Sequence, residues 1–136
     1  MDNRSYILYL LQLSVFRYLS RYFGWFKPDK YYLLNQFFIA GYQFYDGDKI
    51  LNDLNISDEL YISTEPNNEH DKNAVCISYK DFKIGYAPKV DNKLLSELLM
   101  NDVSIHCVVT EIRPDMDPWE RLFVQVFLEG DTFIAS

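Results

Sequence analysis

Three short segments of the sequence bring aromatic rings together with polar and charged side chains, and they contain the residues best suited to bind a ligand. They read AGYQFYDG (40–47), EPNNEHDKNAV (65–75) and IGYAPK (84–89). The rings of Phe44, His70 and Tyr86 can form a wall on which a nucleobase stacks, an interaction worth about 1–3 kcal/mol per base. Asp71 would repel phosphate groups, so its carboxylate suits another task, which is to accept a hydrogen bond from a terminal sugar hydroxyl.

A purely structural interpretation of the same residues stays open at this point. Asp and Asn side chains often cap backbone groups in turns, so Asp71 and Asn73 can simply stabilise their loop. The rings of Phe44 and Tyr86 can fill the core of the domain, and Gly85 can allow close packing of two strands. The residue types alone do not decide between ligand binding and structural support.

The sequence contains few residues in patterns that suit catalysis or metal binding. The sequence contains no GxxxxGK[ST], GxGxxG, HExxH or CxxC motif, so nucleotide hydrolysis and common zinc sites lack their parts. A zinc site would need His70, His106, Cys76 and Cys107 to converge, which their spacing does not indicate. We expect His106 to lie on the solvent side of a strand and both cysteines to pack as small apolar groups. We therefore expect no enzyme activity, no metal and no cofactor.

The length and composition are those of one globular domain. The chain has 136 residues, 49% of them hydrophobic and 24% charged, which excludes disorder as the overall state. Its net charge of −7 excludes a protein that binds nucleic acid or membranes through bulk positive charge. Two cysteines cannot form a disulfide framework, so we expect a reducing compartment and a cytoplasmic location.

The charge is divided unevenly along the chain. Residues 1–30 hold five basic and two acidic side chains, a net charge of +3, whereas the remainder holds 8 basic and 18 acidic ones, a net charge of −10. A long apolar stretch spans 6–26, and a polar stripe recurs on it at steps of three and four residues. The stripe consists of Ser14, Arg17, Arg21 and Gly24. We therefore predict an amphipathic N-terminal helix within residues 1–30.

Two kinds of role for this helix stay open, packing against protein and contact with a membrane surface, and a third is disfavoured. It can pack on the following domain or on a second copy of itself, and its charge would favour contact with an acidic surface. It can also lie on a membrane surface, since arginine and aromatic side chains suit that interface. A spanning or cleaved segment is disfavoured, because Arg17 interrupts the apolar stretch and no small-residue cleavage site follows it.

From residue 36 the pattern becomes typical of β-structure. We predict strands at 37–45, 59–65, 74–79, 82–86, 103–112 and 121–129. A helical turn is expected at 49–54, and a helix capped by Asp91 or Asn92 is expected to continue to Leu99. This count predicts a mostly β (α+β) domain at 36–130, a small closed or partly open barrel of about six strands with one or two short helices.

Taken in order, the three segments resemble the HIRAN domain. The resemblance covers residues 37–128, and its most specific parts are the Asp-x-Asn-Ala-Val entry into one strand and the Ile-Gly-Tyr that follows. It implies an OB-like β-barrel that binds the 3′ end of single-stranded DNA without catalysis. From the family alone, it also suggests a sensor or adaptor in DNA repair or in defence against mobile DNA. The N-terminal helix is not explained by it.

The resemblance assigns six residues to nucleic-acid binding: Gln43, Phe44, His70, Asp71, Tyr86 and Lys89. Asp71 matches the position that contacts the terminal 3′ hydroxyl, and Lys89 matches one that contacts phosphate. Phe44 stands where the family has a stacking Tyr, so it keeps a ring but loses a hydroxyl. Gln43 replaces an Arg and cannot make the bidentate phosphate contact of a guanidinium group.

The acidic character of the domain predicts weak binding. The basic residues near the motifs are Lys72, Lys83, Lys89 and Lys93. Because single-strand affinity depends largely on such groups, we expect dissociation constants on the order of 10⁻⁴–10⁻⁶ M. The alternative is a protein-interaction or membrane-peripheral module, in which the N-terminal helix mediates association and the barrel serves as a platform.

Overall fold

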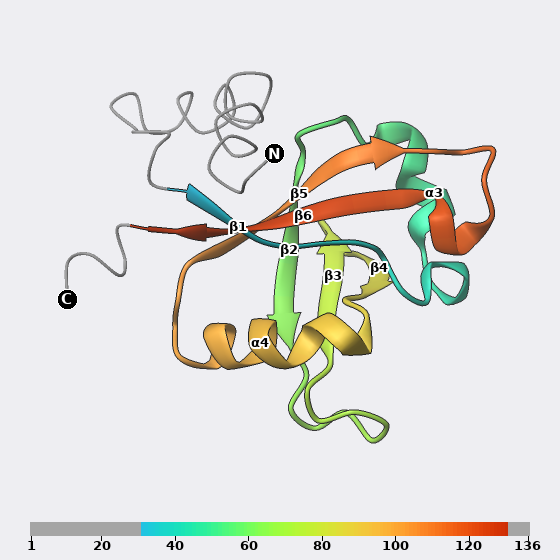
Figure 1. Ribbon diagram of the computed structural model, residues 1–136. Coiled ribbons are helices and arrows are strands. Elements are labelled where there is room, and N and C mark those ends of the chain that lie inside the picture. The colour runs from blue at the N-terminus through green and yellow to red at the C-terminus, as the bar shows by residue number, and fades with distance from the viewer. Residues whose placement is uncertain (1–30, 131–136) are drawn as a thin grey trace.

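The computed structural model describes residues 31–130, which contain a six-stranded antiparallel sheet and one longer helix (Figure 1). The predicted N-terminal helix at 1–30 lies outside the described residues. None of the helices in the described range is long and apolar enough to cross a membrane. All three segments predicted to bind a ligand, 40–47, 65–75 and 84–89, lie within the described residues.

The strands follow one another in the sheet in the order β1-β6-β5-β2-β3-β4. They are β1 (Tyr31–Phe38), β2 (Glu59–Thr64), β3 (Val75–Tyr79), β4 (Phe82–Tyr86), β5 (Ile105–Ile112) and β6 (Leu122–Glu129). The helices are α3 (Gly47–Ile50), α4 (Lys89–Met100) and the 3₁₀ helices η2 (Tyr42–Phe44), η3 (Leu51–Asp53) and η4 (Pro118–Glu120).

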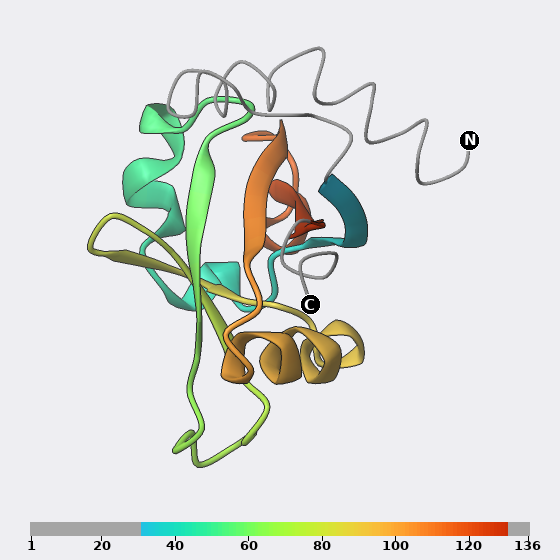
Figure 2. The same cartoon turned by 90° about the vertical axis from the view of Figure 1, so that its left-hand side faces the viewer.

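The sheet is bent at β2, which belongs to two halves. Glu59 and Leu60 pair with β5, whereas residues 61–64 pair with β3. Strands β1, β6 and β5 therefore run at a steep angle to β2 and β3 (Figures 1 and 2). A strand that passes from one half to the other is a usual way to make such a corner. The apolar core lies against the bent sheet and includes Ile39, Ile77, Leu95, Val109 and Val124.

The barrel predicted from the sequence is not closed. Strands β1 and β4 are the two edges of the sheet, and the chain after β1 joins β4 through one isolated bridge, between Ala40 and Tyr86, and one backbone hydrogen bond from Asp46 to Lys83. Gly41 follows this bridge in the left-handed conformation, with φ of 72°, and turns the chain into η2. The segment therefore cannot continue along β4 and complete the barrel.

The strand predicted at 37–45 is wrong for most of its length. Only Phe37 and Phe38 lie in β1, and residues 42–44 form η2 instead. Tyr42 is 1% exposed, and its hydroxyl donates a hydrogen bond to Asp48 Oδ1 at 2.9 Å. Burial of this ring stabilises the helical turn against the strand preference of its aromatic residues.

The other predicted strands and the helix are confirmed, with one shift. In β2 the side chains alternate as expected, since Leu60 is 2% exposed and Tyr61 is 67% exposed. Helix α4 begins at Lys89 directly after Pro88, earlier than the predicted caps at Asp91 or Asn92. Those two side chains make other contacts: Asp91 accepts a hydrogen bond from Asn35, and Asn92 donates one to Asp71.

His106 lies on the strand face opposite the buried Ile105 and Cys107, as predicted, but its side chain is only 23% exposed. Its ring lies between two carboxylates: Nδ1 contacts Glu59 Oε1, and Nε2 lies 3.5 Å from Glu129 Oε2. Tyr31 packs edge-on against the same ring, with 5.5 Å between the centroids. Both cysteines are buried, as predicted, and form no disulfide bond. Strand β5 thus carries a half-buried imidazole held by acidic neighbours.

This arrangement predicts that His106 stabilises the fold most at low pH. Burial alone would lower the pKa of His106, but Glu59 and then Glu129 outweigh it and raise the pKa. The full contribution is present below about pH 6.5, the usual pKa of an unfolded histidine, and is lost as pH rises through the higher folded pKa. Urea unfolding of the wild type and His106→Gln between pH 5.5 and 8.5 measures this. A stability difference that does not shrink with rising pH would contradict it.

Candidate functional site

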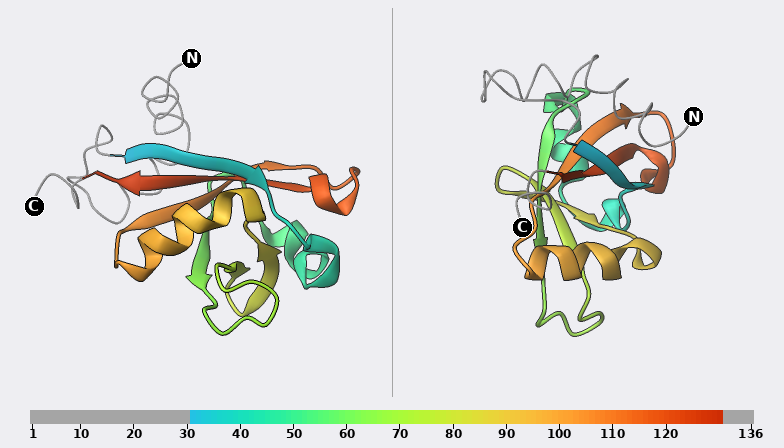
Figure 3. Two further views of the ribbon diagram at one scale, coloured as in Figure 1. Left: turned by 60° about the horizontal axis from the view of Figure 1, so that its bottom comes forward. Right: turned by 60° about the vertical axis from the view of Figure 1, so that its left-hand side comes forward.

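A pocket of about 300 Å³ lies where three parts of the chain meet. These parts are the segment after β1, the loop between β2 and β3, and the junction of β4 with α4. The β2–β3 loop projects beyond the sheet on the side of α4, which places it beside that junction (Figure 3). The lining consists of Ala40, Gly41, Phe44, Tyr45, Asn68, His70, Asp71, Ala74, Tyr86, Ala87, Lys89 and Asn92.

Five of the six residues assigned from the sequence line this pocket. Phe44, His70 and Tyr86 contribute rings, and Asp71 and Lys89 contribute charges. Gln43 is exposed and is not part of the lining. It precedes Phe44, whose ring is 75% exposed and so is available for contact with a ligand.

The carboxylate of Asp71 is held by a hydrogen bond to each of its oxygens. Oδ1 accepts from the backbone N–H of Asn73 at 2.9 Å, and Oδ2 accepts from the amide of Asn92 at 2.8 Å. These bonds, that of Asn73 first, hold the pKa of Asp71 below its ordinary value. Asp71 therefore caps its loop, and each oxygen keeps a further lone pair for another donor.

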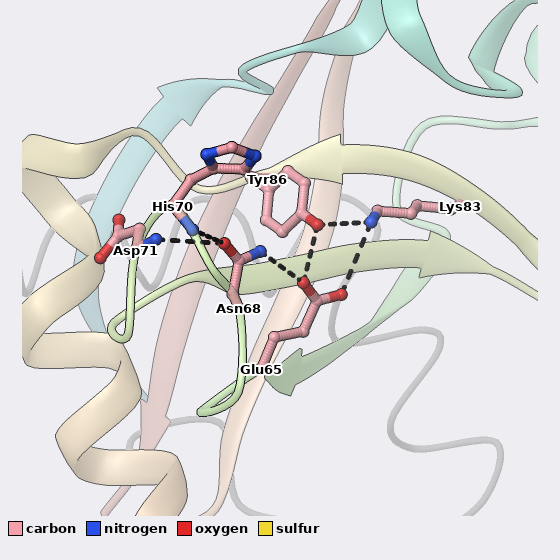
Figure 4. Close-up of polar contacts among 6 residues, drawn as sticks. All are labelled: Glu65, Asn68, His70, Asp71, Lys83 and Tyr86. Atoms are coloured by element: carbon pink, nitrogen blue, oxygen red, sulfur yellow. Dashed lines mark hydrogen bonds and ion pairs between the residues drawn. The ribbon is translucent and has the colours of Figure 1, made fainter.

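Asn68 organises the loop that presents His70 and Asp71. Its side-chain oxygen accepts from the backbone N–H groups of His70 at 2.9 Å and Asp71 at 3.1 Å. Its amide nitrogen donates to Glu65 Oε1 at 3.0 Å. Figure 4 shows that these contacts connect the loop to a second group of residues around Tyr86.

The ring of Tyr86 is held by a partly exposed cluster of polar contacts with Glu65 and Lys83, drawn in Figure 4. Its hydroxyl donates to Glu65 Oε1 at 2.7 Å and accepts from Lys83 Nζ, which also lies 3.5 Å from Glu65 Oε2. Lys83 Nζ stands over the rings of Tyr86 and Tyr45, at 4.3 and 4.5 Å from their centroids. Tyr45 packs edge-on against Tyr86 at 5.8 Å. One wall of the pocket is thereby held in a single orientation.

The same cluster keeps Glu65 and Lys83 charged. Burial alone would raise the pKa of Glu65, but hydrogen bonds from Tyr86 and Asn68 and the charge of Lys83 lower it. Burial alone would lower the pKa of Lys83, but Tyr86 and Glu65 raise it. Burial raises the pKa of the Tyr86 hydroxyl, Lys83 lowers it, and the hydrogen bond to Glu65 raises it again. The net result is a pKa of about 12. The charge of Lys83 is therefore neutralised by Glu65 beside the pocket.

Lys89 supplies the positive charge of the pocket itself. It lines the pocket and is the first residue of α4, the end of the helix where the dipole is positive. Elsewhere in residues 31–130, four of the basic side chains pair with carboxylates. The pairs are Lys49–Asp46, Lys83–Glu65, Arg113–Glu111 and Arg121–Asp48.

Sequence reasoning missed three polar or aromatic residues of the site. Tyr45 and Asn68 lie inside the quoted segments, but their contacts with Lys83 and Glu65 depend on elements distant in the chain. Asn92 is 4% exposed, and its position one helical turn after Lys89 was the available signal. A buried amide on α4 that faces the loop is what positions the carboxylate of Asp71.

The described residues thus form a bent antiparallel sheet with a ring-lined pocket, in which a carboxylate is held by two hydrogen bonds. The sequence profile of the HIRAN domain matches residues 33–130. The chain therefore belongs to the HIRAN domain family, whose members are known as nucleic-acid-binding modules.

Two solved structures share the fold. A crystal structure of a protein from Lactobacillus plantarum is 19% identical, with a TM-score of 0.62, and the match covers 72% of this chain and 94% of that one. The crystal structure of the HIRAN domain of human HLTF is 18% identical, with a TM-score of 0.54, and the match covers 78% and 86%. No curated protein sequence matches the chain.

Proposed function

We propose that the pocket binds the terminal nucleotide at the 3′ end of single-stranded DNA and catalyses no reaction on it. The observation that carries this proposal is the convergence of Phe44, His70 and Tyr86 with the fixed carboxylate of Asp71 on one pocket. Membership of a nucleic-acid-binding family supports it. Aromatic rings suited to stacking and a carboxylate suited to accept a hydroxyl hydrogen bond thus line the same pocket.

The rings hold the terminal base. The ring of Phe44 is 75% exposed and can contact the ligand. The ring of Tyr86 is held in place by a hydrogen bond to Glu65 and by the ammonium group of Lys83 over its face. A wall that is already ordered loses little conformational freedom when it binds. Stacking tolerates every base, so this part of the pocket favours single strands without strong sequence preference.

The carboxylate recognises the sugar end. A free 3′ hydroxyl can donate a hydrogen bond to an oxygen of Asp71, and a bond to an ionised acceptor is stronger than a neutral one. An internal nucleotide or a 3′-phosphate brings negative charge to the same place and is repelled. The carboxylate therefore selects strand ends that carry a hydroxyl.

Lys89 receives the phosphate on the 5′ side of the terminal nucleotide. Its ammonium group and the N-terminal end of α4 both favour an anion at that rim of the pocket. A contribution of Gln43 to the same phosphate stays a prediction, and a neutral amide would add less than the Arg typical of the family.

The test is a fluorescence titration with two short DNA strands of one sequence, one ending in a 3′ hydroxyl and the other in a 3′-phosphate. We expect the hydroxyl-ended strand to bind at least about tenfold more tightly, because the phosphate loses a hydrogen bond and adds repulsion. Equal binding of the two strands would exclude end recognition. Absence of binding to both would exclude the nucleic-acid function.

The salt dependence of this binding is expected to be shallow. Lys89 lines the pocket, and Lys72 and Lys93 are exposed on the adjacent loop and helix. Single-strand binding that neutralises between one and three phosphates has a slope of log K against log salt of about −0.7 to −2. Titrations between 50 and 200 mM salt measure this slope, and a value steeper than about −4 would indicate a wider basic surface.

A further inference from the structure

We infer that the pocket also binds free nucleoside 5′-monophosphates, and that its affinity for them is close to its affinity for a DNA end. This inference rests on the proposed function, because it assigns the same contacts to a smaller ligand. If the two affinities are close, the nucleotides before the terminal one contribute little to the free energy of binding. Three features of the described residues support it.

The first feature is the size of the pocket. Its volume of about 300 Å³ lies at the lower end of the range for small-molecule sites, about 300–1,000 Å³. The lining comes from three short chain segments that surround one space. A pocket of this size holds one nucleotide, so the neighbouring nucleotides of a strand lie outside it.

The second feature is the charge around the pocket. Residues 31–130 contain 8 basic and 17 acidic side chains. Each part of the chain that forms the pocket also carries a carboxylate outside it: Asp46 after Tyr45, Glu69 in the loop and Asp91 in α4. Lys72 and Lys93 partly offset these carboxylates. Further phosphates of a long strand therefore meet no net positive surface and gain little affinity.

The third feature is the match between the contacts and the ligand. A free 5′-monophosphate presents the same base, 3′ hydroxyl and 5′-phosphate as the last nucleotide of a strand. A phosphate monoester carries a charge of about −1.5 to −2 at pH 7, against about −1 for the diester inside a strand. Its attraction to Lys89 is therefore stronger, which offsets the loss of the remaining strand.

The test uses two isomers, 2′-deoxycytidine 5′-monophosphate and 2′-deoxycytidine 3′-monophosphate, as competitors of a labelled hydroxyl-ended DNA strand. The isomers have the same atoms and nearly the same charge, and they differ in whether the 3′ hydroxyl is free. We expect the 5′ isomer to compete with a Kd within about tenfold of the strand, and the 3′ isomer to compete at least about tenfold less well. Asp71→Asn should remove this difference, whereas Asp81→Asn, in the turn between β3 and β4, should leave it unchanged.

The outcomes separate this inference from the proposed function. If the strand binds with hydroxyl selectivity but the 5′ isomer fails to compete, the inference is wrong and the end-binding function stands. If neither the strand nor the mononucleotides bind, both are wrong. If the two isomers compete equally, binding does not involve the free hydroxyl, which overturns the role given to Asp71 in both.

Discussion

Asp71→Asn is expected to abolish the preference of the protein for a 3′ hydroxyl over a 3′-phosphate. The substitution keeps the size of the side chain, and Asn92 can still contact an amide at this position, so the loop should remain folded. The hydroxyl loses an ionised acceptor, which should weaken binding of the hydroxyl-ended strand at least about tenfold. The phosphate-ended strand loses a source of repulsion and should bind more tightly than before.

The opposite signs of these two changes make the result specific. A variant that merely unfolds would lose both strands together, and far-ultraviolet circular dichroism would show it. Asp81→Asn is the matched control, because it removes the same charge from an exposed turn. Because the pKa of Asp71 is lowered from an already acidic value, Asp71 should remain ionised between pH 5 and 8, so its own titration should not alter binding of the hydroxyl-ended strand in that range. An Asp71→Asn protein that retained the wild-type preference would contradict the assignment.

Gly85→Ala is expected to destabilise the fold by about 1–3 kcal/mol, the usual cost of forcing atoms into a packed site. A Cβ at this position would lie 2.4 Å from the backbone oxygen of Ala40 and 2.7 Å from Ile39 Cγ2. The backbone oxygen belongs to the bridge in which Ala40 and Tyr86 exchange hydrogen bonds of 2.8 and 2.9 Å. To relieve the clash, β4 must move away from Ala40, and these bonds must lengthen.

Thermal unfolding measures this change, since 1 kcal/mol corresponds to roughly 4–8 °C for a domain of about 100 residues. Ser78→Ala is the control, because it changes a half-buried side chain on the strand that pairs with β4. The bridge joins two walls of the pocket, so Gly85→Ala should also weaken DNA binding. A melting temperature equal to that of the wild type would show that the approach of β4 to Ala40 is not constrained as described.

Elements with a strong local pattern are predictable from the sequence. The alternation of Leu60, Tyr61 and Ile62 predicts β2 because one face of the strand is buried and the other is exposed. The run of leucines predicts α4, although its first turn is missed because Pro88 precedes it. In both cases the side chains that decide the structure are neighbours in the chain.

Elements that depend on distant contacts are not predictable in this way. Residues 42–44 have strand-forming side chains, yet burial of Tyr42 and the turn at Gly41 make them helical. The open sheet follows from the same turn. His106 stands at a strand position that alternation assigns to solvent, and only the fold brings Glu59 and Glu129 to it.

The candidate site shows the same division. The motifs identify Phe44, His70, Asp71, Tyr86 and Lys89 as residues that belong together, and these five line one pocket. They do not identify the groups that hold the site in place, such as Asn92 on α4, because those contacts cross between elements. The roles of residues 1–30, including self-association and membrane contact, and a cytoplasmic location stay predictions.

The central claim is that a nucleotide with a free 3′ hydroxyl occupies the pocket lined by Phe44, Asp71 and Tyr86. Nuclear magnetic resonance of the ¹⁵N-labelled protein, titrated with a short hydroxyl-ended DNA strand, tests it most directly. We predict that the largest changes in amide signals occur at Gly41, in the loop at 68–74 and at Ala87. Changes confined to a separate cavity, of about 460 Å³ between β2 and β5, or no changes at saturating DNA, would contradict the claim.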